Sequence, residues 1–423
     1  MDFLEKNERK IFFAVLTCFT LIQLLLVLFI DAVPNSDSAG YLKTAEDAIE
    51  AGKLYPLESH FYNRWIAAPG WINILSFFVW ITGTYKSVYF FNIILNLTIV
   101  SEIYYLTRSL AGIKAAFISL FLFTILLSNY GIVLNLLTEL IFTAFLLSAL
   151  IAYLKDKLWM VFFSGVLIGL ANSVRQFAPV IILVFFVSHI IAKSSLKKMI
   201  PWTVSIVFTI IVIGSISYLN SGNFIYSSIS TGGNMIAGAN PLADGSYDGV
   251  AVRKGGIGYI PNEGELTVNE KDAIWKERAI KWIVENPVDW LLLVPRKLFY
   301  LYGCEVSLLY HFRTEPRPGS FVNDFKGVVQ HFPDLSTFEW LLVFNNLVYL
   351  TILALSLLSI YYVFRNSYKP GYIALLYIFV QTGVTVLAVG ADRYHYPMMP
   401  TMIFLAAYTL ISFKREDVGK NNF

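Results

Sequence analysis

The residues that could perform chemistry lie beside long apolar segments. Asp37 stands in "NSDSAGYLKTAEDAIEAGKLY" (35–55), directly after the first apolar run. The stretch after Asp37 predicts a helix, with Asp37 as its N-cap and Gly52 at its end. A carboxylate held beside an apolar surface is also well placed to take a proton from a hydroxyl group, which is the task of a general base. We expect Asp37 to fill both roles and to be the main catalytic candidate.

Four more ionisable side chains lie inside or at the edges of apolar segments: Glu139, Arg175, Lys297 and Arg393. Placing an ionisable group at such a position costs free energy, so by default it indicates a functional cavity. The two arginines are suited to an anionic headgroup. Lys297 fits an ordinary interfacial lysine equally well.

The other three side chains also have structural explanations. Glu139 could stabilise the N-terminus of a helix, with Thr138 as a possible cap. Arg175 could extend to the membrane interface. Arg393 could form a salt bridge with its neighbour Asp392. Function and structure therefore stay open for each residue at this stage.

The composition is that of an integral membrane protein. Of the 423 residues, 57% are hydrophobic and only 14% are charged, with a mean hydropathy of +0.62, whereas soluble domains carry roughly 25% charged residues. The net charge of +3 comes with no basic stripe, so no nucleic-acid partner is expected. Cys18 and Cys304 are too few for a disulfide framework and are expected to be unpaired.

Ten apolar segments have a length suited to membrane crossing. They are 11–30, 86–106, 113–134, 138–154, 158–174, 176–192, 200–219, 338–364, 371–390 and 397–413. The first lacks a cleavage site after it and predicts a retained helix. Clusters of lysine and arginine fall on one side of this ten-span arrangement, which predicts that side to be cytoplasmic.

This arrangement requires two apolar stretches to lie along the membrane surface. Residues 69–83 are short for a span, and residues 286–303 are interrupted by Pro295 and two basic residues. The extracytoplasmic regions are then 31–85, 220–337 and 390–397, with a helix expected near 267–287. The chain divides into an N-terminal transmembrane module (1–219), an extracytoplasmic loop region (220–337) and C-terminal transmembrane helices (338–423).

All five ionisable candidates gather on the predicted outer side. A transporter would more often place polar groups near the midplane, in broken helices and repeated halves. The cytoplasmic side shows no phosphate-binding glycine loop, so the donor should be one that reaches the outer leaflet. No cofactor is indicated by a ligand spacing, although Asp37 and Glu139 could share a divalent cation.

Several motifs, in order, resemble the GT-C superfamily of polytopic glycosyltransferases, particularly the branch with protein O-mannosyltransferases and lipid A aminoarabinose transferases. They are "SDSAGYLKTAEDAIEAGKLY", "APGWINILSFFVWITG", "TELIF", "GLANSVRQFAP", "NPVDWLLLVPRKLFYLYG" and "DRYHYPMMP". The chain departs from many relatives in having "DS" for an acidic pair and "APG" for a double proline. The loop "GGNMIAGANP" looks similar to loops of bacterial members.

The resemblance implies an all-α membrane protein with the GT-C fold and inverting transfer from a polyprenyl-phosphate sugar to a lipid, glycan or protein acceptor. It implies Asp37 as the base and Glu139 as a second acidic residue of the site. Positively charged residues would bind the donor phosphate: Arg393, Arg175, Lys297 and Arg64. Three more residues are expected to line the substrate pocket: Tyr41, Tyr394 and His395.

The expected location is the bacterial cytoplasmic (inner) membrane, with the active site facing outward. An oligosaccharyltransferase is less favoured, because a large soluble C-terminal domain and its "WWDYG" signature do not occur in the sequence. The main alternative is a protein that binds or flips a lipid-linked sugar. A purely structural membrane partner is a weaker alternative.

Overall fold

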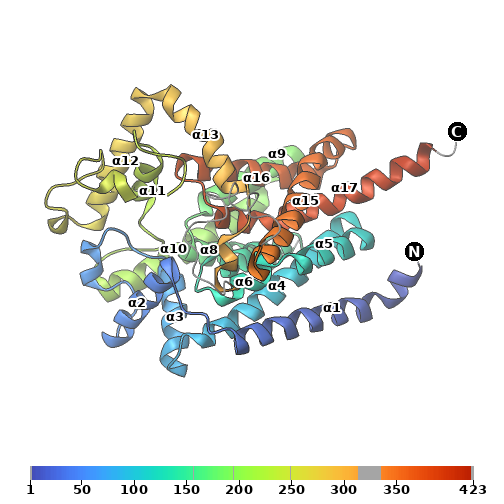
Figure 1. Cartoon of the computed structure of the whole chain (residues 1–423), viewed down its shortest axis with the longest axis horizontal. Helices are drawn as coiled ribbons and strands as arrows, with labels where there is room; N and C mark the ends of the chain where they lie inside the picture. The colour runs from blue at the N-terminus through green and yellow to red at the C-terminus, as the bar shows by residue number, and fades with distance from the viewer. Residues whose placement is uncertain (1, 156, 194, 248, 313–334, 421–423) are drawn as a thin grey trace.

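A computed structural model describes residues 2–155, 157–193, 195–247, 249–312 and 335–420 (Figure 1). This part of the chain is helical, and the β-structure described in it is one isolated bridge between Ile66 and Ile229. The predicted class, an all-α membrane protein, is confirmed.

The helices fall into three groups along the chain. The first group comprises α1 (Asp2–Phe29), α2 (Ser36–Glu50), α3 (Pro69–Thr82), α4 (Lys86–Ala111), α5 (Ile113–Ile125), α6 (Ser128–Gly131), α7 (Glu139–Tyr153), α8 (Leu158–Val174), α9 (Ala178–Ala192) and α10 (Met199–Ser221). The second comprises α11 (Thr231–Gly238), α12 (Val268–Glu285) and α13 (Pro287–Tyr302). The third comprises α15 (Thr337–Arg365), α16 (Lys369–Leu387) and α17 (Met399–Lys420). Short 3₁₀ helices include η6 (Ser307–Phe312) and η7 (Asp392–Met398).

Each of the ten predicted apolar segments contains helix, but their lengths differ. Six described helices are long and apolar enough to cross a membrane: α1, α4, α10, α15, α16 and α17. A seventh candidate is the pair 113–125 and 128–134, which is bent by 65°. Helices α7, α8 and α9 are apolar but shorter. The number of ten spans therefore stays a prediction.

Small residues allow the helices to approach closely. Gly165 and Gly169 of α8 face α10, where an added Cβ would lie 1.9 Å from Ser205 Oγ and 2.5 Å from Thr209 Cβ, respectively. The four-residue spacing places both glycines on one face of α8, as in helix pairs that associate through small residues in membranes. This contact fixes the end of α8 that leads to Arg175.

Helices α2, α3, α11 and α12 lie at one end of the molecule, and both termini lie at the opposite end (Figure 1). The helix expected near 267–287 is α12, which begins with a capping box formed by Thr267 and Glu270. Helix α13 continues through Pro295, so this proline does not end it. The two stretches predicted to lie on the membrane surface form α3 and α13, and neither is among the long apolar helices.

Candidate active site

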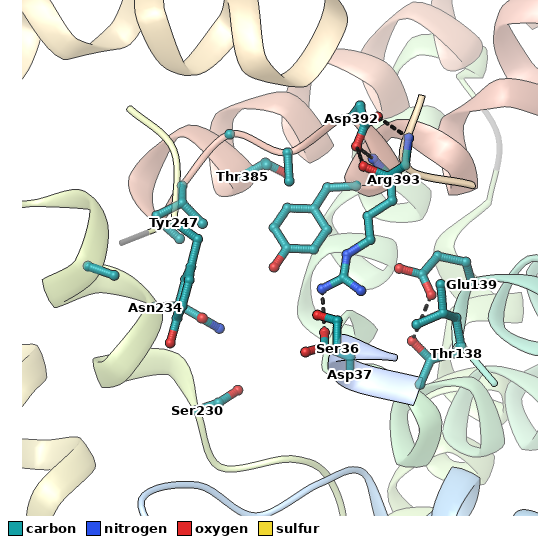
Figure 2. A pocket seen from close by; sticks show the side chains of 18 of the residues that line it. Ser36, Asp37, Thr138, Glu139, Ser230, Asn234, Tyr247, Thr385, Asp392 and Arg393 are labelled. Atoms are coloured by element: carbon teal, nitrogen blue, oxygen red, sulfur yellow. Dashed lines mark hydrogen bonds and ion pairs between the residues drawn. The ribbon is translucent and has the colours of Figure 1, made fainter. Parts of the chain in front are cut away.

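A cavity of about 1740 Å³ lies between the end that carries α2 and α11 and the long apolar helices α15 and α16. Its lining combines segments far apart in the sequence, including the start of α2, the start of α7, the loop before α9, residues 228–252, and the turn after α16. Figure 2 shows that Asp37, Glu139 and Arg393 lie on one side of this cavity. The protein therefore brings its predicted charged residues together from three parts of the chain.

Asp37 is the second residue of α2, which corrects the expectation that it caps this helix. The N-cap is Asn35, and its side chain makes no capping hydrogen bond. The following Ser38 is buried, and its hydroxyl accepts a hydrogen bond from the Leu136 amide (3.1 Å). This bond ties the first turn of α2 to the segment leading into α7. Asp37, the residue before Ser38, lines the cavity.

The predicted end of α2 is confirmed. Gly52 adopts φ +61°, and its amide donates to Ile49 O (3.0 Å), while the Lys53 amide donates to Ala48 O (3.1 Å). This pair of bonds is a Schellman motif, which favours glycine at the left-handed position.

Glu139 is the first residue of α7, where the helix dipole favours a carboxylate. Its carboxylate pairs with Arg175 at 2.8 Å, and only 3% of the Glu139 side chain and 17% of the Arg175 side chain are exposed. Arg175 immediately follows α8 and lies over the Tyr394 ring at 5.3 Å. Arg175 is thus held in the cavity wall by an ion pair. Thr138 occupies the N-cap position without a side-chain capping bond.

Arg393 pairs with the carboxylate of Asp37. The alternative, a salt bridge between Arg393 and Asp392, is not found. The Asp392 carboxylate instead accepts from the Ser307 hydroxyl and from the amides of Ser307 (2.7 Å) and Val306 (2.9 Å). The Arg393 amide also donates to Asp392 Oδ1 (2.8 Å). Asp392 therefore anchors the turn on the start of η6, and this anchoring directs the Arg393 side chain toward Asp37.

The site holds two carboxylates and two guanidinium groups in matched pairs.

Tyr41 lies one turn after Asp37 on α2 and also lines the cavity. Burial, reinforced by the negative charge of Asp37, raises the pKa of the Tyr41 phenol, so the phenol stays protonated and can donate a hydrogen bond. Tyr394 lines the cavity as well, beside both arginines.

Two predicted site residues do not reach the cavity. Lys297 is fully buried and donates to Val386 O (2.9 Å), and burial lowers the pKa of its amine to about 8. His395 is also fully buried, pairs with Glu305, and stacks between the rings of Tyr302 and Tyr349. Neither side chain lines the cavity, so the structure does not bring Lys297 and His395 together with the other predicted site residues.

Arg64 occupies an intermediate position. It lines the cavity, but its guanidinium forms a two-point contact with Glu263 (2.7 and 2.8 Å), and more than half of the side chain is exposed. Water screens the charge of Arg64 more than it screens the charges of Arg393 and Arg175, which are 21% and 17% exposed. Arg393 and Arg175 are therefore the better placed cations.

Sequence reasoning missed the opposite side of the cavity. Ser230, Asn234 and Tyr247 lie there, across from Asp37 and Arg393 (Figure 2). The motif "GGNMIAGANP" was the available signal, since its glycines permit close approaches. A Cβ on Gly232 would lie 2.0 Å from Asp272 O, and one on Gly238 would lie 1.8 Å from Ala388 O.

The carboxylates do not form a ready-made cation site. Each of Asp37 and Glu139 is paired with an arginine. Among the described residues, no group of three or more His, Cys, Asp or Glu is arranged to hold a metal ion.

No protein-family model matches the chain, and no curated sequence does. The fold is similar to that of the Archaeoglobus fulgidus oligosaccharyltransferase tethered to an acceptor peptide containing the NVT sequon. That structure has a TM-score of 0.52 and 14% identity over 98% of this chain and 51% of that chain. A second structure of that enzyme, with Zn and sulfate, has a TM-score of 0.48 and 14% identity over 95% of this chain and 49% of that chain.

The similarity defines the architecture as the GT-C glycosyltransferase fold, which confirms the fold that the motifs predict. The chain spans about half the length of the archaeal enzyme.

Proposed function

We propose that this protein is a membrane glycosyltransferase. It transfers a sugar from a polyprenyl-phosphate donor to a hydroxyl group of an acceptor, at the outer face of a bacterial cytoplasmic membrane. The observation that carries this proposal is the meeting of the Asp37–Arg393 and Glu139–Arg175 pairs in one large cavity. The GT-C fold supports it independently.

The cavity contains groups suited to the phosphate and to the polyprenyl chain of such a donor. Arg393 and Arg175 offer charge-assisted hydrogen bonds to a phosphate, which strengthen as negative charge develops on the leaving group. Apolar side chains from α15 and α16, including Leu342, Val384 and Leu387, line another part of the cavity. They suit a polyprenyl chain that remains in contact with the membrane.

Transfer would follow a single displacement. Asp37 takes the proton of the acceptor hydroxyl as the acceptor oxygen attacks the anomeric carbon. The bond between that carbon and the phosphate oxygen breaks, and its electron pair stays on the lipid phosphate. Attack opposite the leaving group inverts the anomeric configuration.

We expect the donor to bind before the acceptor, because Arg393 pairs with Asp37. Arg393 donates to the Asp37 carboxylate, so it occupies an oxygen of the group that would accept the proton. A donor phosphate would compete with Asp37 for Arg393, so donor binding would release the base for the acceptor. Glu139 would continue to hold Arg175 in the cavity wall.

The decisive experiment compares the purified wild-type protein with Asp37→Asn in lipid, using a panel of polyprenyl-phosphate sugars and cell-envelope acceptors. We expect Asp37→Asn to lower product formation by roughly 10²–10⁴-fold, the usual effect of losing a general base. Mass spectrometry would identify the product. Glu46→Gln is a matched control, because Glu46 is an exposed carboxylate on the same helix.

Two results would contradict the proposal in different ways. Full turnover by folded Asp37→Asn would remove Asp37 as the base. Movement of the lipid-linked sugar across vesicles, without formation of a glycosidic bond, would instead indicate a transport protein.

A further inference from the structure

The side of the cavity opposite the paired charges has a different character. We call the cavity-lining residues of segment 228–252 the outer wall. It presents hydroxyl, amide and aromatic groups, notably Ser230, Asn234, Ser246 and Tyr247. Figure 2 shows three of these residues facing the cavity across from Asp37 and Arg393. A ligand between the two sides would contact charged groups on one side and mainly neutral groups on the other.

Backbone hydrogen bonds hold the outer wall in place at two points. Ile229, just before α11, pairs with Ile66 through two backbone hydrogen bonds of 3.0 and 3.1 Å. Farther along, the Gly390 amide donates to Gly245 O (2.9 Å), three residues before Arg393. The spacing between the outer wall and the arginine turn is therefore set by backbone contacts.

The electrostatics of the outer wall disfavour an anionic ligand. Its described residues include no lysine or arginine, and Asp244 adds a negative charge. Asp244 accepts from the amide and hydroxyl of Ser246, each at 2.8 Å. The N-terminus of α11 does not offset this charge, because the Gly232 amide there already donates to Asp272 (2.7 Å).

Two aromatic rings complete this surface. Tyr247 is 62% exposed, and Trp65, which lines the cavity beside the outer wall, is 42% exposed. Large aromatic side chains provide a flat apolar face next to a polar edge, which suits a ligand with both C–H faces and hydroxyl groups.

We infer that the outer wall binds the acceptor and that the acceptor group bound there is an uncharged sugar unit. Its hydroxyl groups would meet Ser230, Asn234 and Ser246, and its C–H face would lie on Trp65 or Tyr247. This inference rests on the proposed function, since it identifies the acceptor of the same reaction. A phosphorylated or carboxylated acceptor would instead meet Asp244 without a compensating cation from the outer wall.

The first test measures binding without turnover. The wild-type protein in nanodiscs would be applied to an array of immobilised neutral glycans, uronic-acid glycans, phosphorylated glycans and serine/threonine peptides. We expect the neutral glycans to be preferred. Asn234→Ala and Tyr247→Ala should each weaken that binding by roughly three- to tenfold, the effect of losing about one hydrogen bond or stacking contact. Tyr259→Phe is the matched control, since Tyr259 is a partly exposed tyrosine of the same region outside the cavity.

A preference for charged glycans or peptides, or binding to none of the probes, would overturn the inference. So would unchanged binding by both alanine variants. If neutral glycans bind as expected but the wild-type protein forms no product with any donor, the proposed function fails while the glycan site stands. In a working transfer assay, Asn234→Ala should raise the acceptor KM by a larger factor than it lowers kcat.

Discussion

At the scale of single residues, the site depends on where each cation finds its partner. Arg393 pairs with Asp37, Arg175 pairs with Glu139, and the exposed Arg64 pairs with Glu263. The Arg393 and Arg175 side chains are more buried than that of Arg64, so water screens their charges less. Arg393 and Arg175 are also the cations that could bind a donor phosphate next to Asp37, the proposed general base.

Arg393→Gln tests this role. We expect kcat/KM for the donor to fall roughly 10²–10³-fold, since one charged stabiliser of the leaving group is lost. Arg108→Gln is the control, because Arg108 also pairs with a carboxylate, that of Glu8, but does not line the cavity. Steady-state kinetics with a fluorescent or radiolabelled donor would measure both. Similar losses in the two variants would indicate a stability effect and contradict the assignment.

Lys297 gives a pH-dependent prediction. Burial lowers the pKa of its amine to about 8 from 10.5. Between these values the unfolded chain binds more protons than the folded protein, so stability should rise with pH through this window, by up to about 3 kcal/mol. Below pH 8 both states are protonated and this contribution should be constant.

Thermal unfolding in detergent from pH 7 to 10.5 would measure this effect. Lys297→Met should remove the rise in Tm, whereas Lys281→Met, at an exposed lysine of α12, should keep it. An identical pH profile for wild type and Lys297→Met would show that Lys297 is not the titrating group.

At the scale of elements, the position of α11 depends on glycine. An added Cβ on Gly238 would lie 1.8 Å from the backbone oxygen of Ala388, just after α16. A backbone atom cannot move aside as a flexible side chain can, so α11 would have to shift away from the arginine turn.

We expect Gly238→Ala to lower the free energy of unfolding by about 1–3 kcal/mol, seen as a lower Tm, and to reduce transfer. Gly383→Ala in α16 is the control, since nothing lies within 4 Å of its Cβ position. Its Tm should stay the same or rise slightly, because alanine favours a helix interior. Equal Tm values for wild type and Gly238→Ala would mean that α11 is not held by this contact.

At the scale of the whole molecule, the three regions predicted to be extracytoplasmic meet at one cavity. The cavity includes residues before α3, residues 228–252 and the turn 388–394. Both termini lie at the end opposite α2 and α12 (Figure 1). This arrangement agrees with an outward-facing site and cytoplasmic termini, which stay predictions.

Cysteine labelling in intact cells tests the orientation. In a background without Cys18 and Cys304, cysteines at Glu46 and Lys254 should react with an impermeant maleimide. A cysteine at the exposed Lys155 should react only after permeabilisation. The reverse pattern would invert the proposed topology and place the active site in the cytoplasm.

Local information in the sequence determined the membrane class, the helices and the charged residues that merit attention. Hydropathy along the chain locates buried or lipid-facing helices, and signals such as Gly52 and the Thr267 capping box lie within a few residues of the helix ends they form. Asp37, Glu139, Arg175 and Arg393 could be singled out because each charge stands beside an apolar segment.

Only the tertiary structure decided how these residues are used. The partners Asp37 and Arg393 are 356 positions apart, and no local pattern indicates that Arg393 prefers Asp37 to its neighbour Asp392. Contacts between distant segments also bury Lys297 and fix the position of the outer wall. Such choices depend on the packing of the whole chain, because the free energy of a charge or a polar group is set by the groups that surround it in space.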